Sequence, residues 1–121
     1  MITNLNQKND GGIIAYECSE SDWKLFRKKL PIWQENYMDC LNRSYIALLE
    51  RDKAPSDKFW ELEKRVRRDQ RSVGVQARMS RSMMAINILG LLSDGVIALD
   101  DLEGFSDDLV EKMRYLMRGD E

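Results

Sequence analysis

The stretch from residue 94 to residue 101 comes closest to a known chemical site. The tetrapeptide DGVI at 94–97, with Asp101 six residues after its glycine, matches the second half of an EF-hand calcium loop. Carrying the register backward puts Gly90 at the first ligand position and Leu92 at the third, where oxygen ligands are required. Because half of the ligands are missing, we interpret this stretch as a helix cap followed by a short extended connection.

Other residue types with catalytic potential are also poorly arranged. The aspartate pairs at 100–101 and 107–108 are adjacent in sequence, so on a helix their side chains diverge by about 100° and suit caps better than acid/base catalysis. Cys18 and Cys40 match no metal-ligand spacing, and we expect both to be free thiols. The sequence contains no histidine, which excludes the commonest general base. Neither GxxxxGK[ST] nor GxGxxG occurs. We therefore expect no enzymatic activity, no cofactor and no metal.

Charge is segregated along the chain. Residues 64–81 hold seven basic residues and one acid, a local charge of +6. Residues 94–121 hold nine acids and three basic residues, a local charge of -6. The whole chain carries only -2, so no global charge draws it to nucleic acid or to an anionic membrane.

The basic segment begins on a helix that we expect at about 57–71. On that helix the basic residues turn away from a stripe of three apolar residues that we expect to be buried, Phe59, Leu62 and Val66. The candidate interaction surface consists of Trp60, Lys64, Arg67, Arg68 and Arg71.

Two interpretations of this surface stay open. Its arginines can pair with carboxylates, either within the fold or across a dimer, because the guanidinium fork binds them bidentately. Alternatively, Trp60 can stack on a nucleobase while the cations hold phosphates. We favour the first. The sequence then predicts a protein-interaction module that self-associates, and a regulatory nucleic-acid-binding protein is the alternative.

The elements that must position this surface are helical, and the most apolar of them is Met83 to Leu92. This stretch contains a single polar residue, Asn87, and a helix that is apolar nearly all round must be buried on most sides. We expect a central helix from about 75 to 94, capped by Gly95 in the left-handed conformation.

The remaining helices should surround this central one. Ser19 or Ser21 can cap a helix over 22–29, and Pro31 should open a second helix that reaches about 52. The inner face of the second helix is expected to carry Trp33, Tyr37, Leu41, Tyr45 and Leu48. The other expected helices run from Pro55 or Ser56 to about Gln70, over one turn between Asp100 and Gly104, and from Ser106 as a cap to about Arg118, with Leu109, Met113 and Leu116 inward.

These elements predict an all-α protein with a single small bundle of about five helices. Residues 1–15 should form a flexible tail, and residues 16–121 one helical domain. Because no stretch approaches the about 20 apolar residues of a membrane span, and the first 12 residues lack the apolar core of a signal peptide, we expect a cytoplasmic protein.

Methionine leaves one more alternative open. Five methionines are concentrated on the last two long predicted helices, at positions 79, 83, 84, 113 and 117. Their flexible side chains can fill a core or line an adaptable groove for an apolar ligand or a partner helix. We favour the core.

Three stretches carry a resemblance to known proteins. FWELEKRV at 59–66, RSMM at 81–84 and LLSDGVIALDDLEGFSDDL at 91–109 are similar to a group of small uncharacterised helical proteins of Gram-positive bacteria. The resemblance runs from about residue 16 onward and implies a helical fold. No activity, ligand or functional residue comes with it.

Overall fold

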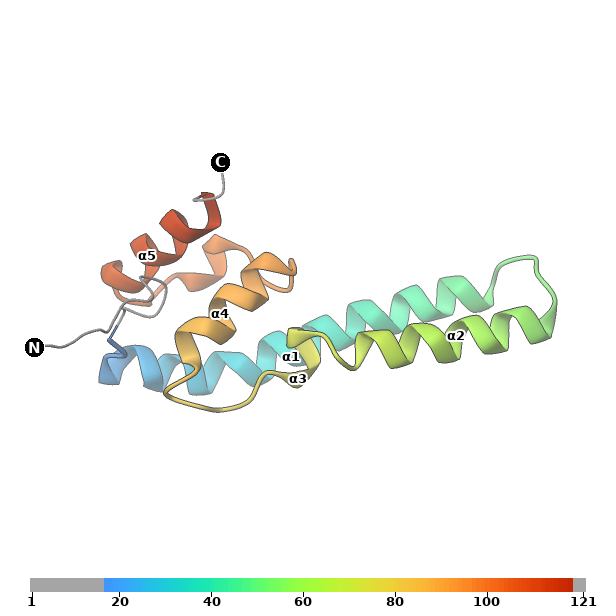
Figure 1. Cartoon of the computed structure of the whole chain (residues 1–121), viewed down its shortest axis with the longest axis horizontal. Coiled ribbons are helices and arrows are strands. Elements are labelled where there is room, and N and C mark those ends of the chain that lie inside the picture. Colours follow the sequence, from blue (N-terminus) through green and yellow to red (C-terminus); the bar gives the residue numbers. More distant parts are fainter. Residues whose placement is uncertain (1–16, 119–121) are drawn as a thin grey trace, which may run out of the picture.

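The described part of the chain, residues 17–118, consists of helices joined by turns and loops in this computed structural model and has no strand (Figure 1). Its elements are α1 (Glu20–Leu49), α2 (Pro55–Asp69), α3 (Val73–Gln76), α4 (Met84–Ser93), the 3-10 helix η1 (Leu99–Leu102) and α5 (Asp107–Arg118). The all-α prediction is confirmed. The predicted tail at 1–15 lies outside the described residues. No helix within 17–118 is long and apolar enough to cross a membrane.

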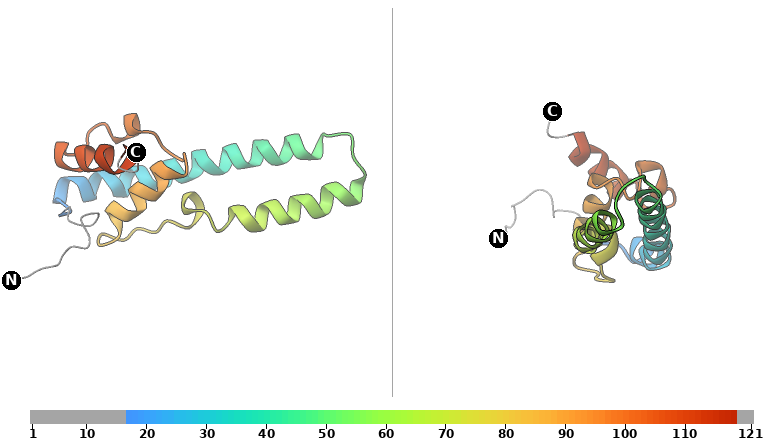
Figure 2. Two further views of the ribbon diagram at one scale, coloured as in Figure 1. Left: turned by 45° about the horizontal axis from the view of Figure 1, so that its top comes forward. Right: turned by 90° about the vertical axis from the view of Figure 1, so that its right-hand side faces the viewer.

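The molecule has two parts, a compact head and a protruding hairpin. In the head, α4, η1 and α5 pack on the N-terminal half of α1. The hairpin is formed by the C-terminal half of α1 and the antiparallel α2, and it extends well beyond the head in Figure 1 and in the left view of Figure 2. Only the head has the layered packing that we expected of the whole bundle.

Helix α1 runs through Pro31 without a break, so the predicted division into two helices is wrong. Ser19 caps its start as predicted, because its side chain accepts a hydrogen bond from Asp22 N at 3.1 Å. Proline removes one backbone hydrogen bond and disfavours a helix interior. Here Leu30 and Trp33, on either side of Pro31, are both buried in the core. Burial of these large side chains holds the helix together across the proline.

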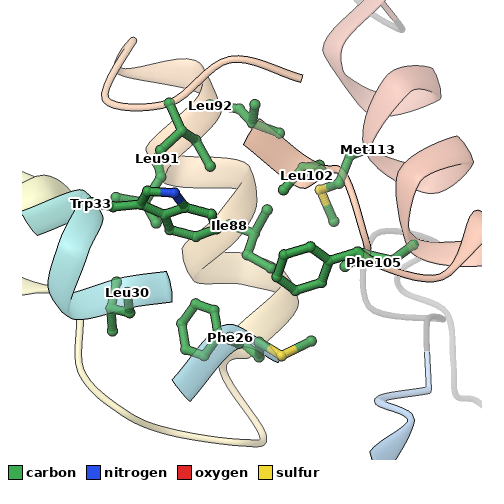
Figure 3. Packing of buried hydrophobic residues seen from close by; sticks show 12 residues of the cluster. Phe26, Leu30, Trp33, Ile88, Leu91, Leu92, Leu102, Phe105 and Met113 are labelled. Atoms are coloured by element: carbon green, nitrogen blue, oxygen red, sulfur yellow. The ribbon is translucent and has the colours of Figure 1, made fainter. Parts of the chain in front are cut away.

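The core lies where α1, α4 and the C-terminal elements meet (Figure 3). Its twelve buried residues are Phe26, Leu30, Trp33, Met84, Ile88, Leu91, Leu92, Ile97, Leu102, Phe105, Leu109 and Met113. The rings of Phe26 and Trp33 meet edge to face with centroids 6.4 Å apart, and Trp33 stacks on Phe105 at 6.2 Å. Of the inward stripe predicted for the last helix, Leu109 and Met113 are buried and Leu116 is half-buried.

The central helix is shorter than the expected 75–94. Its predicted first part forms the separate one-turn helix α3 and a non-helical connection over 77–83. This connection is tied to α1 at its start, where Gln34 Nε2 donates to the backbone oxygen of Ala77 at 2.9 Å. Helix α4 lies in the core as predicted, but Ile86 is 38% exposed, so one side of it stays open to solvent.

The methionines divide between core and surface. Met84 and Met113 are fully buried, as the core interpretation predicts. Met79, Met83 and Met117 are 45%, 44% and 39% exposed, respectively. The interpretation as core residues therefore applies to two of the five.

The calcium-loop-like stretch forms a cap and a turn. Gly95 adopts a positive φ of 74° directly after α4, as predicted for a left-handed cap. Asp101 Oδ2 accepts a hydrogen bond from Ala98 N at 2.8 Å, which uses the carboxylate to begin η1. Within residues 17–118, no group of three His, Cys, Asp or Glu side chains is placed to hold a metal ion.

Candidate interaction surface on the hairpin

The seam between α1 and α2 is largely polar. Arg51 Nη2 and Glu61 Oε1 form an ion pair at 2.7 Å near the tip of the hairpin. Closer to the head, Arg65 Nη2 donates to Ser44 Oγ at 3.2 Å. The one residue that α2 buries is Asp69. Hydrogen bonds and ion pairs therefore join the two helices, beside Leu48 of α1, which is buried outside the core cluster of the head.

Asp69 and Tyr45 form the most enclosed polar contact in the seam. The Tyr45 hydroxyl donates to Asp69 Oδ2 at 2.7 Å, and Arg68 Nη2 lies 3.0 Å from Oδ1. Burial, together with the hydrogen bond to Asp69, raises the pKa of Tyr45 to about 12. Burial by itself raises the pKa of Asp69, but the hydrogen bonds from Tyr45 and Arg68 outweigh it, and the net pKa is lowered.

The prediction that the apolar stripe of α2 is buried is wrong. Phe59 is 61% exposed and Val66 is 37% exposed, and only Leu62 is half-buried. The periodicity correctly placed the three residues on one side of the helix. In the described part of the chain that side is only partly covered, because the hydrogen bonds that join α2 to α1 come from Glu61, Arg65 and Asp69 instead.

All five residues of the candidate surface are exposed, as the sequence predicts, but they do not form one site. Trp60, Lys64 and Arg68 line an open groove of about 730 Å³, together with Lys53, Ser56, Asp57, Glu61 and Arg65. Arg67 lies on the other side of α2, where it lines a hollow with Phe59, Leu62 and Val66. Arg71 follows the end of α2 and faces the connection between α3 and α4.

The cations of this surface differ in how far they are neutralised. Arg67 pairs with Glu63, one turn earlier, and Arg68 pairs with Asp69. Lys64 and Arg71 form no ion pair with any residue in 17–118. These two residues therefore each carry a positive charge that no acid in this part of the chain pairs with.

The basic and acidic segments do not neutralise each other inside the fold. In the described part of the chain, no ion pair joins residues 64–81 to residues 94–118. Arg81 pairs instead with Glu20 at 2.8 Å, and Arg114 pairs with Glu111 within α5. Pairing between these segments inside one molecule, which the sequence left open, is therefore not found among these residues.

Sequence reasoning missed Lys53 and Arg65. Lys53 belongs to the turn between the helices, and it joins the groove only because the hairpin closes. Arg65 was counted within the basic segment, but it reaches into the seam, where its Nε is buried without a hydrogen-bond partner. A signal was available for Arg65, since it lies one turn before Asp69 on the side of α2 that carries few apolar residues.

Comparisons of the chain with protein-family models, with curated proteins and with solved structures find no match. The resemblance to small helical proteins of Gram-positive bacteria stays a prediction. The case for a function therefore depends on the geometry of the hairpin.

Proposed function

We propose that this protein is a non-enzymatic, cytoplasmic protein-interaction module that uses the basic side of its hairpin to bind an acidic protein surface. Self-association is the simplest form of this function, because residues 94–121 of a second copy carry the complementary charge of -6. The single observation that supports the proposal is that Lys64 and Arg71 have no acidic partner within the described part of their own fold.

The proposed contact would be mainly electrostatic. Exposed charge pairs are individually weak and are screened by salt, with a Debye length of about 10 Å at 0.1 M. Trp60, which is 62% exposed beside Lys64 in the groove, would add apolar contact area to the interface. Association should therefore be strongest at low ionic strength.

Sedimentation velocity at low and high salt tests the proposal. We expect association at about 20 mM salt that weakens at about 500 mM, because exposed pairs are screened there. The double variant Lys64→Gln/Arg71→Gln should lose most of this association. The control variant Lys24→Gln/Lys28→Gln removes the same charge from exposed positions on the head and should associate like the wild type. If the wild type is a monomer at both salt concentrations, self-association by charge is rejected.

Nucleic-acid binding is the second candidate function, and the groove favours it specifically. Trp60 shares that groove with Lys53, Lys64 and Arg68, so a base could stack while cations contact the phosphates. Retention on a random single-stranded oligonucleotide should fall with salt, with a log–log slope of about -2 for three phosphate contacts. Trp60→Ala should weaken retention. Flow-through of the wild type at low salt would reject this candidate.

A further inference from the structure

The hairpin has a second side, which we call the apolar face. It lies across both helices, opposite the groove that contains Trp60. Its members are Met38, Leu41, Tyr45, Leu49, Phe59, Leu62 and Val66. Two adjoining hollows share Val66 and Gln70, which makes the face continuous from α1 to α2. Leu49 extends it toward the tip, one helical turn after Tyr45.

This face is only partly covered by the described fold, since Met38, Leu41, Tyr45 and Leu62 are half-buried and the other three members are exposed. Leu49, Phe59 and Val66 are 43%, 61% and 37% exposed, respectively. The seam does not replace this missing burial, because Asp69 is the one buried residue of α2 and Leu62 is only half-buried. Contiguous exposed apolar surface with a polar border is characteristic of protein–protein contact sites.

The border of the apolar face is balanced in charge. Along α1 it carries the Asp39–Arg43 ion pair at 2.7 Å, and along α2 the Glu63–Arg67 pair. Both borders are thus neutral and contain both signs, so they offer no excess charge to a strongly acidic or basic partner.

A second copy fits this pattern because a twofold interface must be complementary to itself. Two amide side chains within the apolar face, Asn42 and Gln70, can each donate and accept hydrogen bonds across such an axis. The 15 residues of α2 extend over about 22 Å, and the hairpin projects beyond the head over this length (Figure 1). Two hairpins can therefore cover each other along their full length.

We propose that the apolar face is the interface of a homodimer in which two hairpins pack face to face as a four-helix bundle. Phe59, Leu62 and Val66 of each copy form the core of this bundle with Met38, Tyr45 and Leu49. This inference goes beyond the proposed function and does not depend on it, because the two use opposite sides of the hairpin. The dimer leaves both Trp60 grooves free.

Adjacent aromatic residues supply a matched pair of variants. Phe59 and Trp60 are 61% and 62% exposed, and their rings contact each other with centroids 4.9 Å apart. Phe59→Ser and Trp60→Ser each remove a large exposed ring and the same ring–ring contact. Only the first removes a side chain from the apolar face.

The test is sedimentation equilibrium of the full chain in about 500 mM salt, where exposed charge pairs are screened. We expect the wild type to be a dimer. Phe59→Ser should raise the dimer Kd at least about tenfold, because a central aromatic residue is lost from both copies. Trp60→Ser should change the Kd by less than about threefold, as a residue outside the interface does. Leu49→Gln, on the other helix, repeats the test if Phe59→Ser loses helicity by circular dichroism.

Three results would overturn the proposal, and a fourth would support it. A wild type that is monomeric at about 100 µM in high salt has no such interface of useful affinity. Equal weakening by Phe59→Ser and Trp60→Ser places the contact elsewhere on α2. In the third result, the dimer dissociates in high salt, is lost in Lys64→Gln/Arg71→Gln and is unaffected by Phe59→Ser. This result would support the proposed function and reject the inference. If the dimer in high salt stays intact in Lys64→Gln/Arg71→Gln but is weakened by Phe59→Ser, the result supports the inference and not the proposed function.

Discussion

Asp22 should contribute more to stability than any other acidic side chain on α1. It is 1% exposed, and it accepts two hydrogen bonds from Ser106, one from the backbone N at 2.7 Å and one from Oγ at 2.6 Å. Ser106 Oγ in turn accepts from Leu109 N at 3.2 Å in the first turn of α5. The carboxylate therefore ties the start of α1 to the start of α5.

The cost of removing this carboxylate follows from these contacts. A hydrogen bond to a charged group contributes about 1.5–3 kcal/mol, and a buried donor left without a partner costs about 1–3 kcal/mol. Asp22→Ala leaves two donors of Ser106 without this acceptor, so we expect a loss of about 3–5 kcal/mol. For a domain of this size that lowers the Tm by about 15–25 °C, at roughly 5 °C per kcal/mol. Asp22→Asn keeps one acceptor and should lose about 1–3 kcal/mol.

Thermal and urea unfolding, followed by circular dichroism at about 222 nm to report helix content, measure this effect. Glu20→Ala is the matched control, because Glu20 is an acid in the same first turn and its side chain is 61% exposed in an ion pair with Arg81. It should lose less than about 1 kcal/mol. In a double-mutant cycle, Asp22→Ala and Ser106→Ala should show a coupling energy of at least about 1 kcal/mol. If Asp22→Ala is no more destabilising than Glu20→Ala, the reasoning is wrong.

The remaining predictions concern the hairpin seam and Pro31. Because the folded pKa of Asp69 is lowered, the stability it contributes is present above its unfolded pKa of about 3.9 and is lost as pH falls through the folded value. Protection of α2 amides from hydrogen exchange should fall with acid in the wild type but stay flat in Asp69→Asn. Because the pKa of Tyr45 is raised to about 12, its contribution is complete below about pH 10 and is lost as pH rises toward 12. An absorbance titration should show one tyrosine that ionises only near pH 12. If this high-pH ionisation is still seen in Tyr45→Phe, it does not belong to Tyr45. Pro31→Ala restores a backbone donor at an exposed site inside α1 and should stabilise the protein by about 1–3 kcal/mol, as the midpoint of urea unfolding will show.

The helix caps could be predicted from the sequence because they depend on neighbouring residues. Ser19 and Ser106 cap the helices they were expected to cap, and Gly95 takes the positive φ expected of a left-handed cap. Pro55 opens α2 as predicted. A cap requires only a side-chain oxygen and the backbone a few residues away, so chemistry within one helical turn decides it.

Long-range packing decided where the sequence was wrong. Pro31 indicated a helix end, but the core contacts of Leu30 and Trp33 carry α1 through it. The residues next to Asp22 in sequence do not distinguish it from an ordinary exposed acid in the first turn of a helix. Its burial and its hydrogen bonds from Ser106 are seen only in the tertiary structure. Its role depends on a residue 84 positions away along the chain.

The candidate site shows the same division. The sequence by itself determined which residues share a side of α2, because helical periodicity is a property of the helix alone. Only the tertiary structure decided which side finds a neighbour. The head elements pack on the N-terminal half of α1, and the hairpin projects past them with Phe59 and Val66 uncovered (Figure 1). An apolar stripe in the sequence predicts that another surface should cover it. Whether a helix of the same chain covers it depends on where the other helices lie.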